Sequence, residues 1–378
     1  MEAKKRIPLH KVFMPDEVIE ELKPVLKSGW IGEGPQTAKF EEKLRKFLKQ
    51  KKITALNSGT SALIMALRLA EIKYNDEIIT TPMTCMATNE PILLAGAIPV
   101  WSDVHPDSGN IDVESIRKKI TIRTKAIMIV HWGGAPCDLD PINELAKEYN
   151  LKVIEDAAHA LGSKYKGKFI GNHSDYVAFS FQAIKHITTG DGGAIACRSI
   201  KDHMRARSLK WFGIDREKRQ TSELGHVLWD IIEPGYKFHM NDIAATIGLT
   251  QFKYLNEIIK KRRENAAFYD NAISEIKGLK ILKPEHQFGE SSYWLYTFLT
   301  KGPEHRLKII RYMREQGIET SIVHQRNDTY KIFKNYNNSD LKGVTEFCDR
   351  MLCLPVGQWV GEEERKYIIE HLHKAAKL

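Results

Sequence analysis

A lysine in the segment FSFQAIKHITTGDGGAIAC, residues 179–197, stands where the chain could give it unusual chemistry. Ser180 ends a short apolar run, Lys185 follows it, and a glycine-rich turn leads into a second apolar run. A lysine held in a partly apolar setting can lose its charge and form a Schiff base with a carbonyl compound. A lone lysine is usually a solvated surface charge, so the neighbouring motifs and their order decide between the two interpretations.

An acidic pair ends another apolar run, in the segment VIEDAAHALG at residues 153–162. An acid at the C-terminal end of a parallel strand points into the crevice where α/β proteins bind ligands. There Asp156 could keep a ring nitrogen protonated, which lets a pyridoxal cofactor act as an electron sink. A helix N-cap is an equally good interpretation of the same aspartate.

The segment NSGTSAL, residues 57–63, follows a short apolar run and opens a helical pattern. Gly59 lets the backbone come close to a ligand, and Thr60 and Ser61 supply hydroxyl groups. Amide groups at the start of a helix form an anion site. The alternative is an ordinary capped helix, with Ser58 or Thr60 as the N-cap.

The elements that must position these residues alternate along the chain. Helices are predicted over 61–70, 112–119 and 140–148. Strands are predicted between and around them, over 53–56, 77–80, 98–100, 126–130, 152–154, 176–179 and 194–196. This alternation predicts an α/β domain with a mostly parallel sheet.

Helical spacing also predicts a helix over 15–29, another around 40–48, and a long one over 240–269. After the long helix come a strand over 293–299, a helix over 306–316 and a terminal helix from 362. This second half is typical of a smaller α+β domain. We therefore expect a large α/β domain over 1–250 and a small C-terminal domain over 251–378, packed closely together.

The composition is that of an ordinary soluble protein, with 378 residues and a formal net charge of +9. The basic residues are dispersed and no nucleic-acid motif is present, so no nucleic-acid partner is expected. No apolar stretch has the length of a signal peptide or a membrane span, so we expect a cytoplasmic protein without a membrane partner. Five scattered cysteines without a CxxC pair predict neither disulfides nor a metal site.

Taken together, the motifs resemble the DegT/DnrJ/EryC1/StrS family of sugar aminotransferases, over about residues 11–372. The matching segments, in family order, are WIGEGP, SGTSAL, residues 80–89, PVWSDV, VIEDAAHALG, SFQAIKHITTGDGG, GYKFHMNDIAATIGLTQ and LPVGQW. The resemblance implies the aspartate-aminotransferase-like fold (fold type I), with pyridoxal 5′-phosphate (PLP) as cofactor. It also implies a homodimer with shared active sites.

The resemblance implies a role for each matching residue. Lys185 would bond covalently to the cofactor and move protons, and Asp156 would pair with the pyridine nitrogen. His159 falls where a Gln or His approaches the phenolic oxygen. Residues that would hold the phosphate or otherwise contact the cofactor are Gly59, Thr60, Ser61 and Ser180.

Three positions are informative because the family varies there. Cys85 stands where the family usually has an aromatic residue stacked on the pyridoxal ring. Lys237 replaces the Asn of a GYN motif that reaches the phosphate of the partner subunit, and a surface lysine is the alternative interpretation. A branch of the family carries His in place of the Schiff-base lysine and catalyses dehydration, so Lys185 favours transamination.

Substrate contacts are predicted with less support from the residues. Trp30 and Ile31 match a family loop that lines the sugar site. His324 and Arg326 fall where the family places sugar or diphosphate contacts, and an arginine can pair bidentately with phosphate. His186 is a further candidate substrate contact, with a local hydrogen bond as the alternative.

The predicted reaction transfers an amino group from L-glutamate, or less often glutamine, to a nucleotide-linked keto-deoxysugar. A 4-keto-6-deoxyhexose is the expected acceptor, 2-oxoglutarate the co-product, and aminosugar or surface polysaccharide biosynthesis, such as that of O-antigen, the expected pathway. The alternatives are a PLP-dependent sugar dehydratase of the same family and a non-catalytic regulator that senses a sugar nucleotide.

Overall fold

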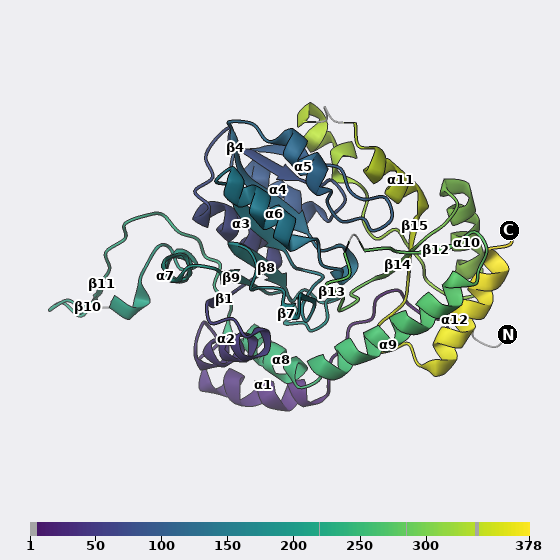
Figure 1. Cartoon of the computed structure of the whole chain (residues 1–378). Helices are drawn as coiled ribbons and strands as arrows, with labels where there is room; N and C mark the ends of the chain where they lie inside the picture. Colours follow the sequence, from purple (N-terminus) through teal and green to yellow (C-terminus); the bar gives the residue numbers. More distant parts are fainter. Residues whose placement is uncertain (1–5, 219, 285, 337–339) are drawn as a thin grey trace.

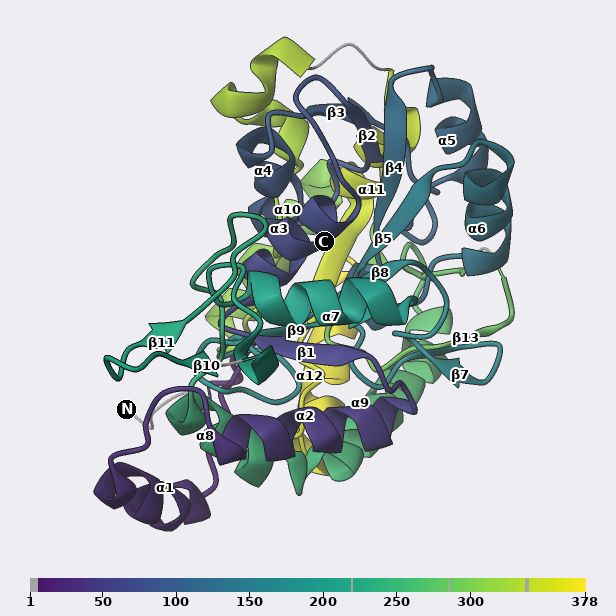
Figure 2. The ribbon, with the colours of Figure 1, turned by 90° about the vertical axis from the view of Figure 1, so that its left-hand side faces the viewer.

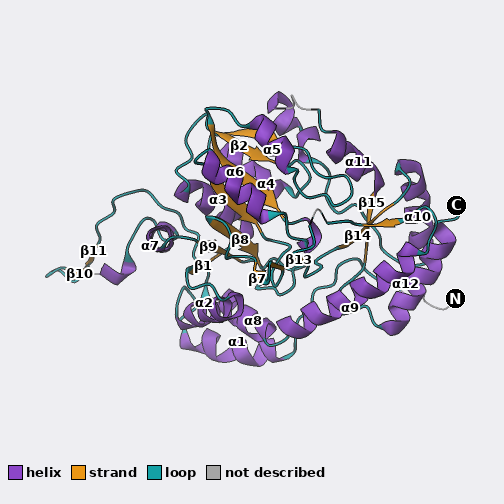
Figure 3. Ribbon diagram, in the orientation of Figure 1, coloured by secondary structure: helices purple, strands orange, loops and turns teal. Residues whose placement is uncertain are grey.

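The computed structural model describes residues 6–218, 220–284, 286–336 and 340–378, and it places a sheet with helices on both faces beside a smaller helical and sheet unit (Figures 1 and 3). The large sheet has seven strands in the order β1-β9-β8-β5-β4-β2-β3. Strand β9 runs antiparallel to both of its neighbours, while the pairs on the β5, β4, β2 and β3 side are parallel. The strands are β1 (Ile53–Leu56), β2 (Glu77–Thr80), β3 (Ile98–Trp101), β4 (Thr124–Val130), β5 (Lys152–Asp156), β8 (Tyr176–Ser180) and β9 (Gly193–Cys197).

Alternate residues of the central strands enter different cores, which is why these strands read as continuous apolar runs. In β4, Ile127 packs into the core beneath helices α2, α5 and α6, whereas the adjacent Met128 packs beneath α3, α4 and α7. The first group is α2 (Pro35–Leu48), α5 (Val113–Lys119) and α6 (Leu139–Glu148), and the second is α3 (Gly59–Leu69), α4 (Met86–Leu94) and α7 (Ile200–Leu209). The predicted α/β fold with a mostly parallel mixed sheet is confirmed.

The smaller unit is built on the antiparallel sheet β12-β14-β15. Its strands are β12 (Lys280–Ile281), β14 (Tyr296–Leu299) and β15 (Met351–Leu354), and its helices are α9 (Leu255–Ser274), α10 (Pro303–Glu315), α11 (Lys342–Arg350) and α12 (Glu362–Ala375). In Figure 1, α9 runs from the large sheet to this unit and lies beside α12. Ile7, near the N-terminus, joins the core of this unit and pairs with Ile318. The domain boundary between residues 250 and 251 stays a prediction.

Two elements differ from their predicted extents. The helix expected over 240–269 is two helices, α8 (Asp242–Phe252) and α9, because α8 packs on α1 (Glu17–Ser28) and α2 whereas α9 continues toward the second core. The strand expected from residue 293 begins at Tyr296. Tyr293 has a φ of 49°, which a strand residue does not adopt.

A long arm leaves the large unit between α7 and α8 and carries the short hairpin of β10 (Gln220–Thr221) and β11 (Val227–Leu228). Both views show this arm standing away from the rest of the chain (Figures 1 and 2). Shorter elements complete the chain: β6 (Lys164–Tyr165), β7 (Lys168–Phe169), β13 (Gly289–Glu290), and the 3₁₀ turns Trp132–Gly134, Arg216–Lys218, Asn327–Thr329 and Lys331–Tyr336. Within the described ranges, no helix has both the length and the apolar character needed to span a bilayer.

Candidate active site

A cavity of about 540 Å³ opens where the C-terminal end of β5 and the loop after β8 face the start of α3. It gathers side chains that are far apart in the sequence, because parallel strands end at one edge of the sheet. The candidate residues that line it are Gly59, Thr60, Cys85, Asp156, His159, Ser180, Lys185 and His324.

Asp156 is the last residue of β5 and is 5% exposed. Its Oδ2 accepts a hydrogen bond of 2.6 Å from the hydroxyl of Thr88, and its Oδ1 accepts one of 3.0 Å from the amide of Ala158. A second hydroxyl, that of Thr84, lies 2.7 Å from the hydroxyl of Thr88. Charge-assisted hydrogen bonds of this kind hold a carboxylate in one orientation, so Asp156 presents a fixed anion to the cavity.

Lys185 follows β8 and directs its amino group into the same cavity. Burial lowers the pKa of Lys185 to about 8, and the negative charge of Asp156 opposes a larger shift. Its Nζ lies 3.7 Å from the ring centroid of Trp294. A lysine with this pKa is partly neutral near physiological pH, which suits it both for bonding to a carbonyl carbon and for carrying protons.

The start of α3 meets the end of β8 at one end of the cavity, in contacts that admit only small residues. A Cβ added to Gly59 would stand 2.9 Å from Cβ of Ser180. A Cβ on Gly193, at the start of β9, would overlap the carbonyl of Ser58. Within the described part of the chain, the amides of Gly59 and Thr60 have no acceptor. These first-turn amides and the hydroxyl of Ser180 form a cradle for an anion.

Ser61 lies behind this cradle rather than in the cavity. Its hydroxyl donates to Oδ1 of Asn57 at 2.7 Å, and its amide donates to the side chain of Ser58, the N-cap of α3. Ser61 therefore stabilises the loop before the helix. The capped-helix interpretation and the anion-site interpretation both describe part of this segment.

Cys85 and His159 lie on different walls of the cavity. Cys85 is the half-buried residue before α4, and none of the five cysteines forms a disulfide within the described part of the chain. His159 is 3% exposed and stacks on Trp294, with 3.8 Å between ring centroids. Burial and the charge of Lys185 hold the pKa of His159 well below its usual value. Its Nδ1 is buried and has no hydrogen-bond partner in the described structure.

His186 and Arg326 do not line the cavity. His186 is buried, and its Nε2 donates to the carbonyl of Ser292 at 3.1 Å, which is the local hydrogen bond considered as its alternative. Arg326 donates twice to the carboxylate of Asp328, at 2.8 and 2.7 Å, and once to the hydroxyl of Thr345. In this arrangement its guanidinium is already occupied by a buried carboxylate.

Lys237 is exposed and also lies outside the cavity. Its Nζ stands 3.1 Å from the ring centroid of Trp211, and its carbonyl accepts a hydrogen bond from Asn57 beside the anion cradle. The backbone of Lys237 is thus close to the anion cradle of the same chain, while its side chain lies over Trp211.

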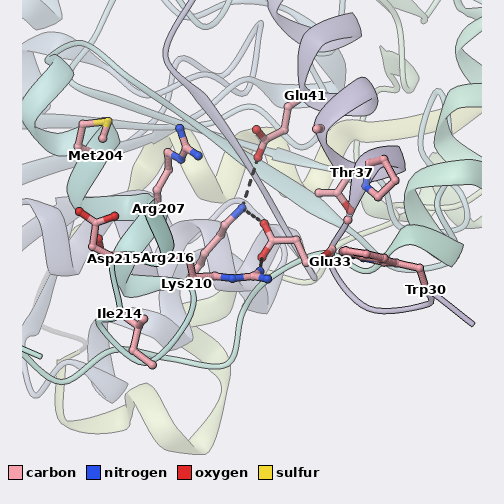
Figure 4. Close-up of a pocket in the computed structure, with 14 residues that line it drawn as sticks. Trp30, Glu33, Thr37, Glu41, Met204, Arg207, Lys210, Ile214, Asp215 and Arg216 are labelled. Carbon is pink, nitrogen blue, oxygen red and sulfur yellow. Dashed lines mark hydrogen bonds and ion pairs between the residues drawn. The ribbon is translucent and has the colours of Figure 1, made fainter. Parts of the chain in front are cut away.

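Trp30 lines a different cavity, of about 460 Å³, between α2 and α7 (Figure 4). There Glu33 reaches between two cations, with Oε1 2.5 Å from Nζ of Lys210 and Oε2 3.0 Å from Nη1 of Arg216. The ring of Trp30 borders this cavity and is 61% exposed, and Ile31 is 48% exposed. Neither side chain lines the cavity of Lys185 in this chain.

Several residues that line the Lys185 cavity or support it were not predicted. Trp294 and His10 come from the second half of the chain and from its first residues, and their rings stack at 5.2 Å. Thr88 carries the hydrogen bond to Asp156. Thr88 falls within residues 80–89, one of the segments that carry the family resemblance, and this is the signal that could have pointed to it. No local pattern in the sequence marks Trp294 or His10.

The donors and acceptors present fit PLP. A fixed carboxylate, a lysine with a lowered pKa and an anion cradle surround one cavity, and His159 lines the same cavity. These are the groups that a pyridine nitrogen, an aldehyde carbon, a phosphate and a phenolic oxygen require. The described residues contain no cluster of His, Cys, Asp and Glu suited to a metal ion.

Comparison with known proteins agrees with this chemistry. The model of the DegT/DnrJ/EryC1/StrS aminotransferase family matches residues 14–373. A dTDP-4-dehydro-2,3,6-trideoxy-D-glucose 4-aminotransferase from Saccharopolyspora spinosa is 30% identical to this chain. The alignment spans 98% of this chain and 97% of the relative.

Solved structures show the same relationship. AtS13 from Actinomadura melliaura superposes with a TM-score of 0.92 and 35% identity over 99% of this chain and 100% of its own. The PLP form of a putative sugar aminotransferase from Streptococcus pneumoniae gives a TM-score of 0.90 and 28% identity over 99% of both chains. The chain therefore belongs to the DegT/DnrJ/EryC1/StrS family of PLP-dependent sugar aminotransferases.

Proposed function

We propose that this protein transfers an amino group from L-glutamate to a nucleotide-linked keto-deoxysugar, with a 4-keto-6-deoxyhexose as the acceptor. The observation that carries the proposal is a lysine, Lys185, in the cavity with Asp156, where the dehydrating branch of the family has histidine. The Saccharopolyspora spinosa relative, whose name gives a nucleotide-linked 4-keto deoxysugar, supports this acceptor class. An aminosugar for a surface polysaccharide is the product we expect.

PLP, when bound, supplies an electron-withdrawing ring that stabilises negative charge on the carbon that loses a proton. The residues of this chain do the remaining work. Lys185 would accept the proton from the α-carbon of the amino donor, and in the second half of the reaction it would place a proton on the sugar carbon that receives the amino group. The carboxylate of Asp156, oriented by its hydrogen bond from Thr88, would stabilise the protonated ring nitrogen of the cofactor. The amides of Gly59 and Thr60 bind the phosphate.

Dimerisation is part of the proposal, because two features of the single chain are incomplete by themselves. The arm between α7 and α8 exposes large apolar side chains to solvent, among them Leu224 at 88%, Ile232 at 87% and Ile231 at 50%. The sequence predicts that Trp30 and Ile31 contact the sugar and that Lys237 contacts the phosphate. All three lie outside the Lys185 cavity of their own subunit. A second copy that packs on the arm would cover the apolar residues and bring these side chains toward its site.

The decisive experiment incubates the PLP-loaded protein with GDP-, UDP- and dTDP-linked 4-keto-6-deoxyhexoses, with L-glutamate, L-glutamine or no donor, and measures products by mass. Glutamate-dependent conversion of keto to amino sugar, with release of 2-oxoglutarate, is the expected result. Loss of water without an amino donor would instead show the dehydratase. Binding of the sugar nucleotide without any turnover would show a regulator.

Lys185→Ala and Lys185→Arg test the assignment of the reacting lysine. Both should abolish transamination and remove the absorbance band of the covalently attached cofactor. Lys210→Arg is the matched control, because Lys210 is buried in an ion-pair cluster of the other cavity. Turnover retained in Lys185→Ala would overturn the proposal.

A further inference from the structure

Trp294 makes a contact with Lys185 that none of the roles above explains. Nζ of Lys185 lies 3.7 Å from the centroid of the indole, within the range where an aromatic face attracts a cation. Trp294 is 2% exposed and lines the same cavity. Cation–π attraction is strongest where water is excluded, so burial of Trp294 strengthens its attraction for the amino group of Lys185.

His159 occupies the opposite face of the indole. Its ring centroid lies 3.8 Å from that of Trp294, and the two planes differ by 18°. An imidazole and an amino group that both come within 4 Å of the ring would overlap on one face, so the indole stands between them. Burial and the charge of Lys185 keep His159 neutral, because they hold its pKa well below the usual value. His10 and His324 also stack on the indole, at 5.2 and 6.1 Å, and burial lowers the pKa of His10 to about 4 and that of His324 to about 3. Lys185 therefore supplies the cation at this ring among the described residues.

The indole is also fixed in place. Its Nε1 donates a hydrogen bond of 2.9 Å to the carbonyl of Ile184, the peptide group that immediately precedes Lys185. Nη1 of Arg262 donates to the carbonyls of Tyr293 and Trp294, at 3.1 Å each. Arg262 is 2% exposed, so these are buried anchors. The ring, its backbone and the backbone of Lys185 thus form one rigid unit.

We propose that Trp294 is a positioning residue for the reaction: its indole face holds the amino group of Lys185 whenever that group is not bonded to the cofactor. A free lysine side chain has several rotatable bonds and would otherwise sample many positions between proton transfers. The aromatic ring holds the protonated amino group over the cavity, because the attraction acts on its positive charge. The inference rests on the proposed function only in that Lys185 is the reacting lysine.

The test uses fluorinated tryptophans, which weaken the electron-rich face of the ring while they change its size very little. Mono-, di-, tri- and tetrafluorotryptophan are placed at position 294 by site-specific incorporation in the full-length chain. In cofactor-free protein, the pKa of Lys185 is measured from the pH dependence of its labelling by an amine-specific reagent, read by peptide mass. We expect this pKa to fall stepwise by about 0.5–1 unit across the series, because the protonated form loses its attraction to the ring.

In the PLP-loaded protein, the same series should lower kcat several-fold while KM for the sugar nucleotide and the melting temperature stay constant. The matched control is the same series at Trp132, a buried indole that also packs on His324 and has no lysine over its ring among the described residues. A pKa of Lys185 that is flat across the series at position 294, or that falls equally in the Trp132 series, would overturn the inference. Labelling requires no turnover, so this result is independent of whether the proposed transamination occurs.

Discussion

The hydroxyl of Thr88 donates a 2.6 Å hydrogen bond to Oδ2 of Asp156, across the gap between the start of α4 and the end of β5. The amide of Ala158 binds the other carboxylate oxygen, so both oxygens of Asp156 are directed by the protein. A carboxylate that must stay beside a positive ring nitrogen depends on such directed hydrogen bonds, because they favour its charged form and fix its orientation.

Thr88→Val keeps the shape of the side chain and removes this bond. We expect kcat/KM to fall about tenfold or more, since a hydrogen bond to a buried charged group contributes about 1.5–3 kcal/mol. Thr246→Val is the matched control, because Thr246 is equally buried but donates to a helix carbonyl in α8. Steady-state kinetics of both variants decide the question, and equal losses would show that the Thr88 bond has no special role.

Cys85→Phe tests what covers the cofactor ring. An aromatic side chain at this half-buried position, just before α4, would stack on the cofactor ring. Such stacking contributes about 0.5–1.5 kcal/mol beyond the effect of the buried apolar area. We therefore expect PLP to bind about 2–10-fold more tightly, measured as Kd by fluorescence titration. Cys85→Leu supplies similar apolar volume without a ring. If Leu tightens binding as much as Phe, volume rather than stacking explains the change.

The strand ends could be predicted from the sequence, and with them the residues that lie at one edge of the sheet. Asp156, Ser180 and Gly59 each adjoin a short apolar run, and parallel strands bring such positions together whatever the details of the loops. Lys185 lies further into a loop, where neighbouring side chains diverge. Its neighbour His186 turns away to the carbonyl of Ser292, and no periodicity in the sequence distinguishes the two directions.

The rest of the site depends on contacts between segments distant in the chain. Trp294 reaches Lys185 only because the strand Tyr296–Leu299 of the second core lies beside the large sheet. Arg326 was predicted to contact a diphosphate because arginine suits phosphate, but Asp328, two residues later, binds its guanidinium. Which side chains pair within an irregular turn depends on the backbone conformation of the turn. Sequence patterns do not predict that conformation.

Arg326→Gln separates a structural role from a substrate contact. Loss of the bidentate pair removes two charge-assisted hydrogen bonds from the 3%-exposed Asp328, so we expect the free energy of unfolding to fall by about 1–3 kcal/mol. KM for the sugar nucleotide should change little. The double variant Arg326→Gln/Asp328→Asn should recover part of the loss, because it removes the buried carboxylate together with the half-buried cation that pairs with it. A large rise in KM without a loss of stability would restore the diphosphate interpretation.

The histidines around Lys185 make the protein sensitive to acid. Burial lowers the pKa of His10 to about 4 and that of His324 to about 3, whereas an unfolded chain titrates near 6.5. Below about pH 6.5 the unfolded state therefore binds more protons, and stability falls as the pH decreases toward 4. Each such histidine costs about 1.4 kcal/mol per pH unit in this window. Urea unfolding between pH 7 and 5 measures the slope.

His10→Gln should flatten this dependence, because one group that takes up a proton on unfolding is gone. His226→Gln, at an exposed position of the arm, is the control and should leave the slope unchanged. A slope that His10→Gln leaves unaltered would mean that other groups determine the sensitivity to acid.

The arm supplies the test of dimerisation. Ile232 is 87% exposed and Leu224 88% exposed in the single chain, so replacing both with Asp removes no contact within a subunit. If a second copy covers the arm, the same change buries two carboxylates in an apolar interface, which is strongly unfavourable. We expect the Leu224→Asp/Ile232→Asp variant to sediment as a monomer with the melting behaviour of a folded chain and with greatly reduced activity.

The matched control is Ile122→Asp, which changes an isoleucine that is 96% exposed in the turn between α5 and β4. It should leave both the oligomeric state and the activity as they are, because the turn leads into β4 whereas the arm leaves from α7, which packs on β1 and β9. Strands β8 and β5 separate β9 from β4 in the sheet. Sedimentation velocity with activity assays on the same samples distinguishes the outcomes. A double-Asp variant that keeps the mass of the parent assembly would show that the arm is not its interface, and the apolar residues there would then require another partner.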